Sequence, residues 1–245
     1  MTMPPVVLIT GAARRIGAAT ARMLHADGWR VVVHAHRSID VARELVAELC
    51  ARRADSATAL AADLNDPAQI DALAQAAQAR WGRLDALVNN ASTYYPTPLG
   101  TITAAQIDDL VASNLRAPLL LTQACAALMG EGAQVINIID VHARRPLPGY
   151  AAYCAAKAGL WALTESLAQE LAPRVRVNAV APGHMIWATN SSMSAEQQAA
   201  EVARIPVQRL GGREEIARAV RFLLSDGGSY LNGAVIPVDG GLRLS

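Results

Sequence analysis

The sequence predicts an α/β fold, a doubly wound parallel sheet of about seven strands with helices on both faces. Short apolar, β-branched runs alternate with Ala-rich helical stretches along the 245 residues. The runs are apolar on both sides, as in strands that helices cover on each face. No repeat, linker or low-complexity tract divides the chain, so we expect one domain over residues 1–245.

The individual elements follow from the same patterns, taken in chain order. The expected strands are Val6–Thr10, Arg30–Ala35, Ala57–Ala61, Leu84–Asn89, Gln134–Ile139, Arg174–Val180 and Ala234–Val238. The expected helices include Ala18–Asp27, Val41–Arg53, Pro67–Trp81 and Tyr150–Leu171. Pro182–Ser194 contains Gly, Pro, Asn and Ser and predicts a loop over the site, which we interpret as a substrate lid.

Composition limits the classes of partner. The net charge is +1 and no long basic run occurs, so neither nucleic acid nor membrane is expected, and small molecules are the predicted partners. Cys50, Cys125 and Cys154 are odd in number and lack metal-ligand spacing, which favours reduced thiols and no metal. No signal peptide or membrane span is recognisable, so a cytoplasmic location is expected.

The first strand ends in a glycine-containing segment that leads directly into a helix. Gly11 permits a tight turn and Gly17 close packing, with Arg14, Arg15 and Ile16 between them. The helix N-terminus offers free N–H groups and a positive dipole to a pyrophosphate. The segment predicts a dinucleotide site, although glycines between a strand and a helix also occur for turn reasons alone.

The second strand ends without the acid that an NAD-preferring protein places there to bind the ribose hydroxyls. His36, Arg37 and Ser38 stand there instead, and Arg37 can bind a 2′-phosphate through its forked donors, which favours NADPH. The alternative is a solvated loop arginine. Asp63, followed by Leu64, either hydrogen-bonds the adenine edge or caps the next helix.

Two further strand ends carry candidate ligand contacts. Asn90, Ala91 and Ser92 follow the fourth strand, where small residues allow a cofactor to approach the backbone, and Tyr94 offers an aromatic face to a planar ligand. After the sixth strand, Pro182-Gly183 predicts a tight corner whose donors face a nicotinamide carboxamide. Packed turns are the simpler interpretation of both segments.

Tyr153, Lys157 and Asp140 are the candidate catalytic residues. Tyr153 and Lys157 are four residues apart on a predicted helix, about 5–6 Å between β-carbons, so the ammonium is expected to lower the pKa of the phenol. Tyr153 is therefore the expected proton donor. Asp140 ends a buried apolar run and is expected to reach the phenol, and Arg15 to reach both pyrophosphate and substrate.

These motifs together resemble the short-chain dehydrogenase/reductase family, from Thr10-Gly11 to the segment Val238-Asp239-Gly240-Gly241. The resemblance implies a Rossmann fold, hydride transfer with NAD(P)H, Tyr153 as general acid and Lys157 on the nicotinamide ribose. It also implies that Asn114 holds a water-linked proton relay to the lysine. Family members usually form homotetramers through long helices and the C-terminal strand region, and the same assembly is expected here.

Within that family the details are similar to the pteridine reductases. Arg15 replaces a usual glycine, Asp140 replaces a usual serine, and His36-Arg37-Ser38 completes the set. The resemblance implies a pterin sandwiched between nicotinamide and Tyr94, with Arg15, Ser92, Asp140, Tyr153 and Trp187 as substrate contacts. The better-known members carry phenylalanine where Tyr94 stands, which changes pocket polarity. His184 and Met185 either line the pocket with Trp187 or form an ordered loop core.

Two other functions are alternatives to an NADPH-dependent pteridine reductase. A carbonyl or oxoacyl reductase of the same family fits the general motifs, but Asp140 and Arg15 argue against it. A non-catalytic protein that binds NADPH and senses its ratio leaves Tyr153 and Lys157 without a purpose. Biopterin, monapterin and dihydrofolate types of substrate are not distinguished by these residues.

Overall fold

The computed structural model describes residues 3–185 and 193–245 and contains one seven-stranded parallel sheet. The strands lie in the order β3-β2-β1-β4-β5-β6-β7, and every neighbouring pair is parallel. They are β1 (Val6–Ile9), β2 (Arg30–Ala35), β3 (Ala57–Ala61), β4 (Ala86–Asn89), β5 (Ala133–Ile138), β6 (Val175–Pro182) and β7 (Val235–Val238). The strand order reverses between β1 and β4, the switch point where doubly wound sheets bind ligands.

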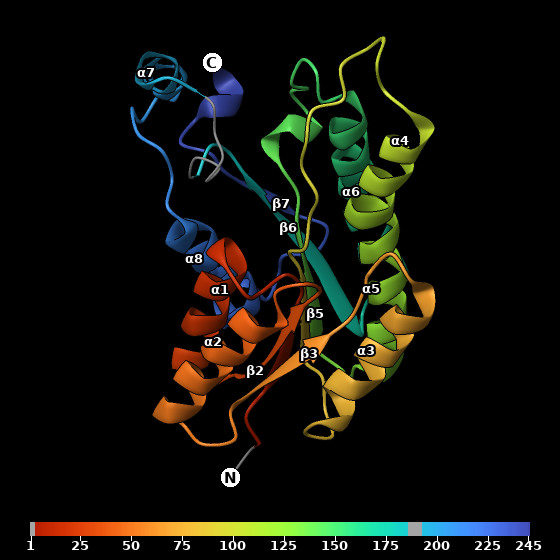
Figure 1. The fold of residues 1–245 in the computed structure, drawn as a ribbon. Coiled ribbons are helices and arrows are strands. Elements are labelled where there is room, and N and C mark those ends of the chain that lie inside the picture. The colour runs from red at the N-terminus through yellow and green to blue at the C-terminus, as the bar shows by residue number, and fades with distance from the viewer. Residues whose placement is uncertain (1–2, 186–192) are drawn as a thin grey trace.

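Helices cover both faces of the sheet, as the sequence predicts (Figure 1). One layer contains α1 (Arg15–Ala26), α2 (Ile39–Arg52) and α8 (Arg213–Leu224), and the other contains α3 (Pro67–Ala79), α4 (Ala104–Val111), α5 (Ala117–Leu128) and α6 (Ala151–Glu170). Along β1, Val7 and Ile9 belong to one core cluster and Val6 and Leu8 to another. All four side chains are fully buried, because a helical layer packs on each face of the strand.

Several element boundaries differ from the sequence-based expectation. Helix α1 begins at Arg15 rather than Ala18, and β6 continues through Pro182 instead of ending at Val180. At the other end of the expected lid, Ser194 caps α7 (Ala195–Ala203) by accepting a hydrogen bond from the Gln197 N–H at 3.2 Å. Residues 186–192 of that predicted loop lie outside the described residues.

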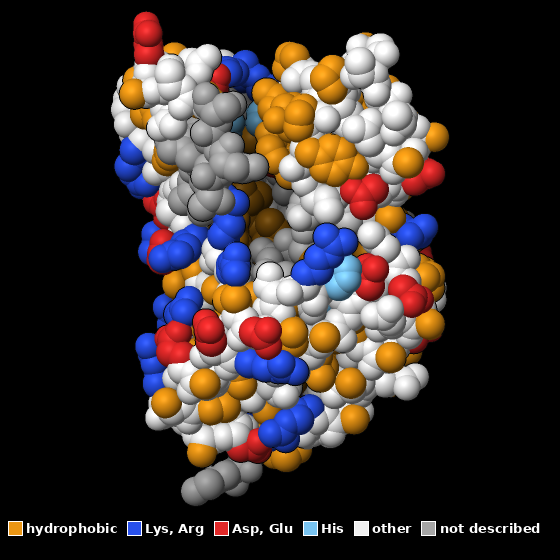
Figure 2. All heavy atoms as spheres, viewed as in Figure 1, with side chains coloured by type: hydrophobic (Ala, Val, Ile, Leu, Met, Phe, Trp, Pro, Cys, Tyr) orange, Lys and Arg blue, Asp and Glu red, His pale blue; other side chains and the backbone are white. Residues whose placement is uncertain are grey.

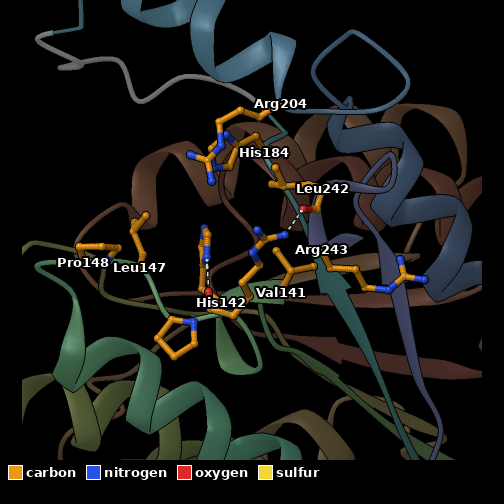
Figure 3. Close-up of a pocket in the computed structure, with 10 residues that line it drawn as sticks. Val141, His142, Leu147, Pro148, His184, Arg204, Leu242 and Arg243 are labelled. Atoms are coloured by element: carbon orange, nitrogen blue, oxygen red, sulfur yellow. Dashed lines mark hydrogen bonds between the residues drawn. The ribbon is translucent and has the colours of Figure 1, made fainter. Parts of the chain in front are cut away.

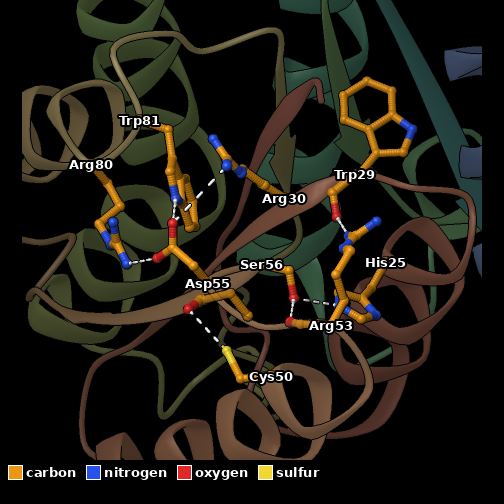
Figure 4. Close-up of polar contacts among 10 residues, drawn as sticks. His25, Trp29, Arg30, Cys50, Arg53, Asp55, Ser56, Arg80 and Trp81 are labelled. Atoms are coloured by element: carbon orange, nitrogen blue, oxygen red, sulfur yellow. Dashed lines mark hydrogen bonds and ion pairs between the residues drawn. The ribbon is translucent and has the colours of Figure 1, made fainter. Parts of the chain in front are cut away.

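Near the N-terminal ends of the strands, polar side-chain contacts hold neighbouring segments together (Figure 4). The Asp55 carboxylate accepts hydrogen bonds from Arg80 and from Trp81 Nε1, the latter at 3.2 Å. His25 Nε2 lies 2.7 Å from Ser56 Oγ. These contacts attach the turn before β3 to α1 and to the residues after α3.

All three cysteines are free thiols, as expected from their number and spacing. Burial raises the pKa of the Cys125 thiol to about 12, so this group is not a nucleophile at neutral pH. Within the described part of the chain, no helix has the length and apolar character needed to cross a bilayer.

Candidate active site

Thr10 joins the ends of β1 and β4 at the switch point. Its Oγ1 accepts hydrogen bonds from the N–H groups of Asn90 and Ala91, at 2.9 and 3.0 Å. The Asn90 Nδ2 group in turn donates to the Thr10 carbonyl at 2.8 Å. The predicted glycine turn and the predicted Asn90-Ala91 segment are therefore held against each other.

Gly11 and Gly17 are required by close backbone approach at this turn. Gly11 has φ +59°, and a Cβ there would lie 3.0 Å from Ala91 Cα. A Cβ on Gly17 would lie 2.7 Å from Ala12 Cα and 2.8 Å from the Gly11 carbonyl oxygen. The glycines are therefore explained by the close packing of this turn against the segment after β4 and against itself, and the dinucleotide site stays a prediction.

Arg15 occupies a backbone conformation that favours glycine. Its φ is +55°, in the left-handed region, which costs a non-glycine residue about 1–2 kcal/mol. The side chains of Arg14 and Arg15 are exposed, while Ile16 is half-buried. The backbone of Arg15 is therefore strained at the start of α1. Backbone strain of this kind is concentrated at functional sites.

His34 is a site residue that the sequence analysis missed. Its ring is buried in β2, where Nδ1 accepts a hydrogen bond from the Gly11 N–H at 3.2 Å and Nε2 lies 3.1 Å from the Ala62 carbonyl oxygen. Burial lowers its pKa to about 4. A lone histidine in the otherwise apolar run Val31-Val32-Val33 was the available signal.

The end of β2 presents the expected polar group beside a hollow. His36 and Arg37 are exposed there, and Ser38 immediately precedes α2. Figure 2 shows a hollow on one face of the molecule with arginine side chains and a histidine at its rim. His36 Nε2 lies 3.8 Å from Asp63 Oδ2, so the ends of β2 and β3 lie close together.

The structure decides one of the two interpretations of Asp63. The N-cap of α3 is Asp66, whose side chain accepts a hydrogen bond from the Ala68 N–H at 3.0 Å. Asp63 instead accepts from the Asn65 N–H at 2.9 Å, a local turn contact. The helix-cap interpretation of Asp63 is therefore wrong. The half-buried Leu64 packs on the core beside it.

Asn114 lies on a π-helical turn, Ala112–Arg116, which the sequence analysis did not anticipate. It is fully buried, and its Nδ2 donates to the Leu110 and Thr93 carbonyls, both at 3.0 Å. Its Oδ1 accepts a hydrogen bond from Ser92 Oγ at 2.6 Å. The side-chain amide is thus occupied in holding the loop after β4, and the relay role stays a prediction.

Asp140, Tyr153 and Lys157 converge at the end of β5. Tyr153 donates its hydroxyl hydrogen to Asp140 Oδ2 at 2.8 Å, while Asp140 Oδ1 accepts from the His142 N–H at 2.8 Å. Lys157 Nζ donates to the Ile138 carbonyl at 3.0 Å and lies 5.8 Å from the centre of the Tyr153 ring. Tyr153 and Lys157 are both buried.

The expected lowering of the Tyr153 pKa by Lys157 is wrong for this arrangement. Burial and the neighbouring Asp140 carboxylate raise the pKa of Tyr153 well above its ordinary value. Burial also lowers the pKa of Lys157 to about 8 and Asp140 opposes that effect, so the ammonium is itself weakened. Burial, followed by the Asp140 carboxylate, therefore outweighs any lowering of the Tyr153 pKa by Lys157.

Tyr94 places an aromatic ring against Tyr153. The Tyr94 ring stacks on Tyr150 with centroids 4.7 Å apart and meets the Tyr153 ring edge-on at 4.8 Å and 81°. It is 52% exposed, so part of the ring borders solvent. Tyr95 packs against the cluster that contains Tyr153, and its hydroxyl donates to Asp109 Oδ2 at 2.9 Å.

The corner after β6 differs from the expectation. Gly183 donates its N–H to the Val238 carbonyl at 3.1 Å, so Pro182-Gly183 does not offer a free donor there. A Cβ on Gly183 would lie 2.7 Å from Asp239 Cβ, which explains the glycine by packing. Met185 is buried in the core, as the loop-core alternative has it, whereas His184 lines a cavity. The predicted contact Trp187 lies outside the described residues.

Known proteins resemble the chain over nearly its full length. A family model described as enoyl-(acyl carrier protein) reductase, of the short-chain dehydrogenases, matches residues 11–243. Pteridine reductase 1 of Leishmania tarentolae is 36% identical, covering 98% of this chain and 97% of its own. A 3-oxoacyl-[acyl-carrier-protein] reductase of Synechocystis is 37% identical, covering 97% and 96%, and one of Staphylococcus aureus is 35% identical over the whole of both chains.

These relatives are enzymes, and the matches cover nearly the whole of this chain and of each relative. The parallel seven-stranded sheet, the glycine turn at its switch point and the Tyr153–Lys157 pair agree with the match. The chain therefore belongs to the short-chain dehydrogenase/reductase family, whose enzymes are oxidoreductases that use nicotinamide cofactors.

Proposed function

We propose that this oxidoreductase is an NADPH-dependent pteridine reductase. The observation that carries the proposal is the 2.8 Å hydrogen bond from the buried Tyr153 hydroxyl to Asp140. A carboxyl at this position gives the site a second group that can bear a proton and accept hydrogen bonds from a nitrogen-rich ring. A hydroxyl in its place would not carry a charge or a titratable proton near neutral pH.

The cofactor-binding proposal follows from the geometry of the switch point. Gly11 and Gly17 allow the tight turn before α1, whose N-terminus is proposed to face a pyrophosphate, and the exposed Arg37 supplies forked donors to a ribose 2′-phosphate. The remaining residues proposed to contact the cofactor are Arg14, Arg15, Ile16, His36, Ser38, Asp63, Leu64, Asn90, Ala91, Ser92, Tyr153 and Lys157. Bound NADPH supplies the hydride for a pterin ring carbon.

The residues of the chain supply the proton and its environment. Tyr153 gives its hydroxyl proton to the ring nitrogen next to the carbon that receives the hydride. This leaves a phenolate in the buried site, where Asp140 orients the phenol through their hydrogen bond. Lys157, whose Nζ lies 5.8 Å from the centre of the Tyr153 ring, offsets the negative charge.

Tyr94 and Arg15 are proposed to hold the substrate ring. The partly exposed Tyr94 lies edge-on to Tyr153, so a planar ring beside the phenol meets an aromatic surface. Ser92 and the strained Arg15 lie at neighbouring strand and helix ends and offer hydrogen bonds to polar ring edges. Trp187 remains a proposed contact from the sequence alone.

The chain is also proposed to assemble as a homotetramer. An open groove of apolar character lies between α5 and α6, lined by Leu115, Leu119, Gly159, Ala162, Leu163 and Ser166. A second copy presenting the same helices would cover it, as expected of a self-complementary interface. Light scattering coupled to gel filtration should give four times the 25.8 kDa chain mass.

The proposed reaction is tested by NADPH oxidation with the purified protein. Dihydrobiopterin, dihydromonapterin and dihydrofolate are compared with a panel of ketones and an oxoacyl thioester, and each assay is repeated with NADH. Preferential turnover of a pterin with NADPH is expected, and Asp140→Ala should remove most of it, since positioned proton donors contribute about 10²–10⁴-fold.

An oxoacyl reductase is the second candidate, because relatives with that activity are as similar in identity as the pteridine reductase. Turnover of the thioester or ketones alone would establish it. Tight NADPH binding without turnover of any substrate would instead support a non-catalytic role. Full pterin turnover by Asp140→Ala would contradict the role proposed for the carboxyl.

A further inference from the structure

A cavity of about 210 Å³ lies directly beside the candidate catalytic group (Figure 3). Its wall includes Val141 and His142, the two residues that follow Asp140, and Leu147, which packs on the cluster that contains Tyr153. One water needs only about 10–15 Å³ of such space, so the cavity can hold a group of many atoms.

The lining of this cavity is unusually rich in cationic and imidazole groups. Arg145, Arg204 and Arg243 line it together with His142 and His184, and no aspartate or glutamate is among the described residues of its wall. Arg243 contributes little, since its guanidinium points away in Figure 3 and pairs with Asp239 at 3.0 Å. Arg145 and Arg204 therefore supply the anion contacts, while His184 Nδ1 lies 3.8 Å from Glu201 Oε2.

Arg145 is the strongest of these contacts. One of its five N–H donors is used, Nη1 donating to the Leu242 carbonyl at 3.2 Å, and no ion pair of Arg145 is found within residues 3–185 and 193–245. Arg204 pairs with Glu201 at 3.0 Å, which holds its side chain near the cavity while neutralising part of its charge. An anion placed here would therefore find forked donors that the protein itself does not fill.

The two imidazoles add directed groups. His142 Nδ1 lies 2.9 Å from the Arg145 carbonyl oxygen, so this nitrogen carries the hydrogen and Nε2 of the neutral ring accepts a hydrogen bond from a donor on the ligand. Figure 3 shows the His142 ring extending from that contact toward Arg204 and His184, and the two imidazole centroids lie 5.9 Å apart. Leu147 and Pro148 form an apolar wall on the side next to Tyr153.

We infer that this cavity is a subsite for an anionic group, a carboxylate or a phosphate, that the substrate carries on an apolar stem. The apolar wall from Leu147 and Pro148 accommodates the stem, and Arg145 and Arg204 bind the anion. The inference rests on the proposed function, because the ring attached to the stem would be the one reduced at Tyr153. Pterins with charged side chains are then preferred over those with neutral hydroxyalkyl chains.

The test compares kcat/KM of the wild type with that of the double variant Arg145→Gln/Arg204→Gln. The substrates are dihydrobiopterin, whose side chain is neutral, dihydrofolate, whose tail bears carboxylates, and a dihydroneopterin phosphate. For a substrate with an anionic tail, kcat/KM of the double variant should fall about tenfold or more, because hydrogen bonds to the charged group are lost. For dihydrobiopterin, kcat/KM should not change. The substrate that suffers the greater loss identifies carboxylate or phosphate as the natural group.

Arg43→Gln is the matched control, because it removes an exposed arginine from α2 whose partner is the nearby Asp40. It should change none of the three values. Equal losses of the double variant on neutral and charged substrates, or no loss on either, would overturn the subsite.

Calorimetric titration with p-aminobenzoylglutamate and with inorganic phosphate separates this inference from the proposed function. If the wild type reduces no pterin, the proposed function fails. The subsite still stands if either probe binds the wild type and loses affinity in the double variant. Absence of binding by both probes, with no charge discrimination in turnover, refutes it.

Discussion

The imidazole of His34 on β2 accepts a hydrogen bond from the backbone N–H of Gly11 at 3.2 Å. Its other nitrogen lies 3.1 Å from the Ala62 carbonyl oxygen beyond β3. A carbonyl only accepts and an amide N–H only donates, so the neutral ring with hydrogen on Nε2 is the form that makes both contacts. A titratable side chain thus fastens the glycine turn to two neighbouring strands.

This contact predicts acid sensitivity. The pKa of His34 is about 4 when folded, against an ordinary value of 6.5, so the unfolded chain takes up this proton first as pH falls. The stabilisation is present above pH 6.5 and is lost toward pH 4, by up to about 3 kcal/mol. Urea unfolding at a series of pH values should show this slope for the wild type and a smaller one for His34→Leu. Equal slopes for both proteins would exclude His34 as the source.

Replacing Arg15 by glycine should stabilise the fold and weaken ligand binding. Its φ of +55° costs an arginine about 1–2 kcal/mol that glycine does not incur. Thermal melting of Arg15→Gly without ligand should therefore occur at a higher temperature, while NADPH and pterin affinities fall. Gln208→Gly, at φ 56° outside the glycine turn, is the control for ligand affinity and should leave it unchanged. A gain in both stability and affinity would argue against the proposed role of Arg15.

Arg37 should determine the choice between the two nicotinamide cofactors. Arg37→Ala removes forked donors from the end of β2 and should weaken NADPH binding about tenfold or more, because charge-assisted hydrogen bonds are lost. NADH binding should be unaffected, since NADH lacks the 2′-phosphate. Fluorescence titration with both cofactors measures the ratio. A parallel loss for NADPH and NADH would indicate a general role in the loop instead.

Gly17→Ala should disrupt the turn that is proposed to bind pyrophosphate. The new methyl group would lie 2.7 Å from both Ala12 Cα and Asn90 Nδ2, so backbone must move, at a cost of about 1–3 kcal/mol. We expect a lower melting temperature together with loss of NADPH affinity. Gly130→Ala provides the comparison, because nothing lies within 4 Å of a Cβ there, and it should behave like the wild type. Normal cofactor binding by Gly17→Ala would show that the turn accommodates the methyl group.

The doubly wound fold was predictable because its signals are local. Apolar runs such as Val31-Val32-Val33 need only their own sequence to indicate a strand buried on both faces, and the strand ends indicated where ligand-binding residues gather. Element boundaries were less accurate: α1 begins at Arg15 because the chain enters the helix through a left-handed residue that propensity does not anticipate.

The sequence by itself determined the sheet, the family resemblance and the residue types at the site, because periodicity and motif spacing are properties of neighbours along the chain. The hydrogen-bond partners, burial and pKa values of those residues depend on the tertiary structure. It buried Tyr153 and placed Asp140 against it, and both raise the pKa of the phenol where the Lys157 spacing alone suggested the opposite. In the folded chain the Gly183 N–H donates to the Val238 carbonyl, and His34 Nδ1 accepts a hydrogen bond from the Gly11 N–H. Hydrogen bonding and desolvation depend on which distant segments meet, and no local pattern specifies that.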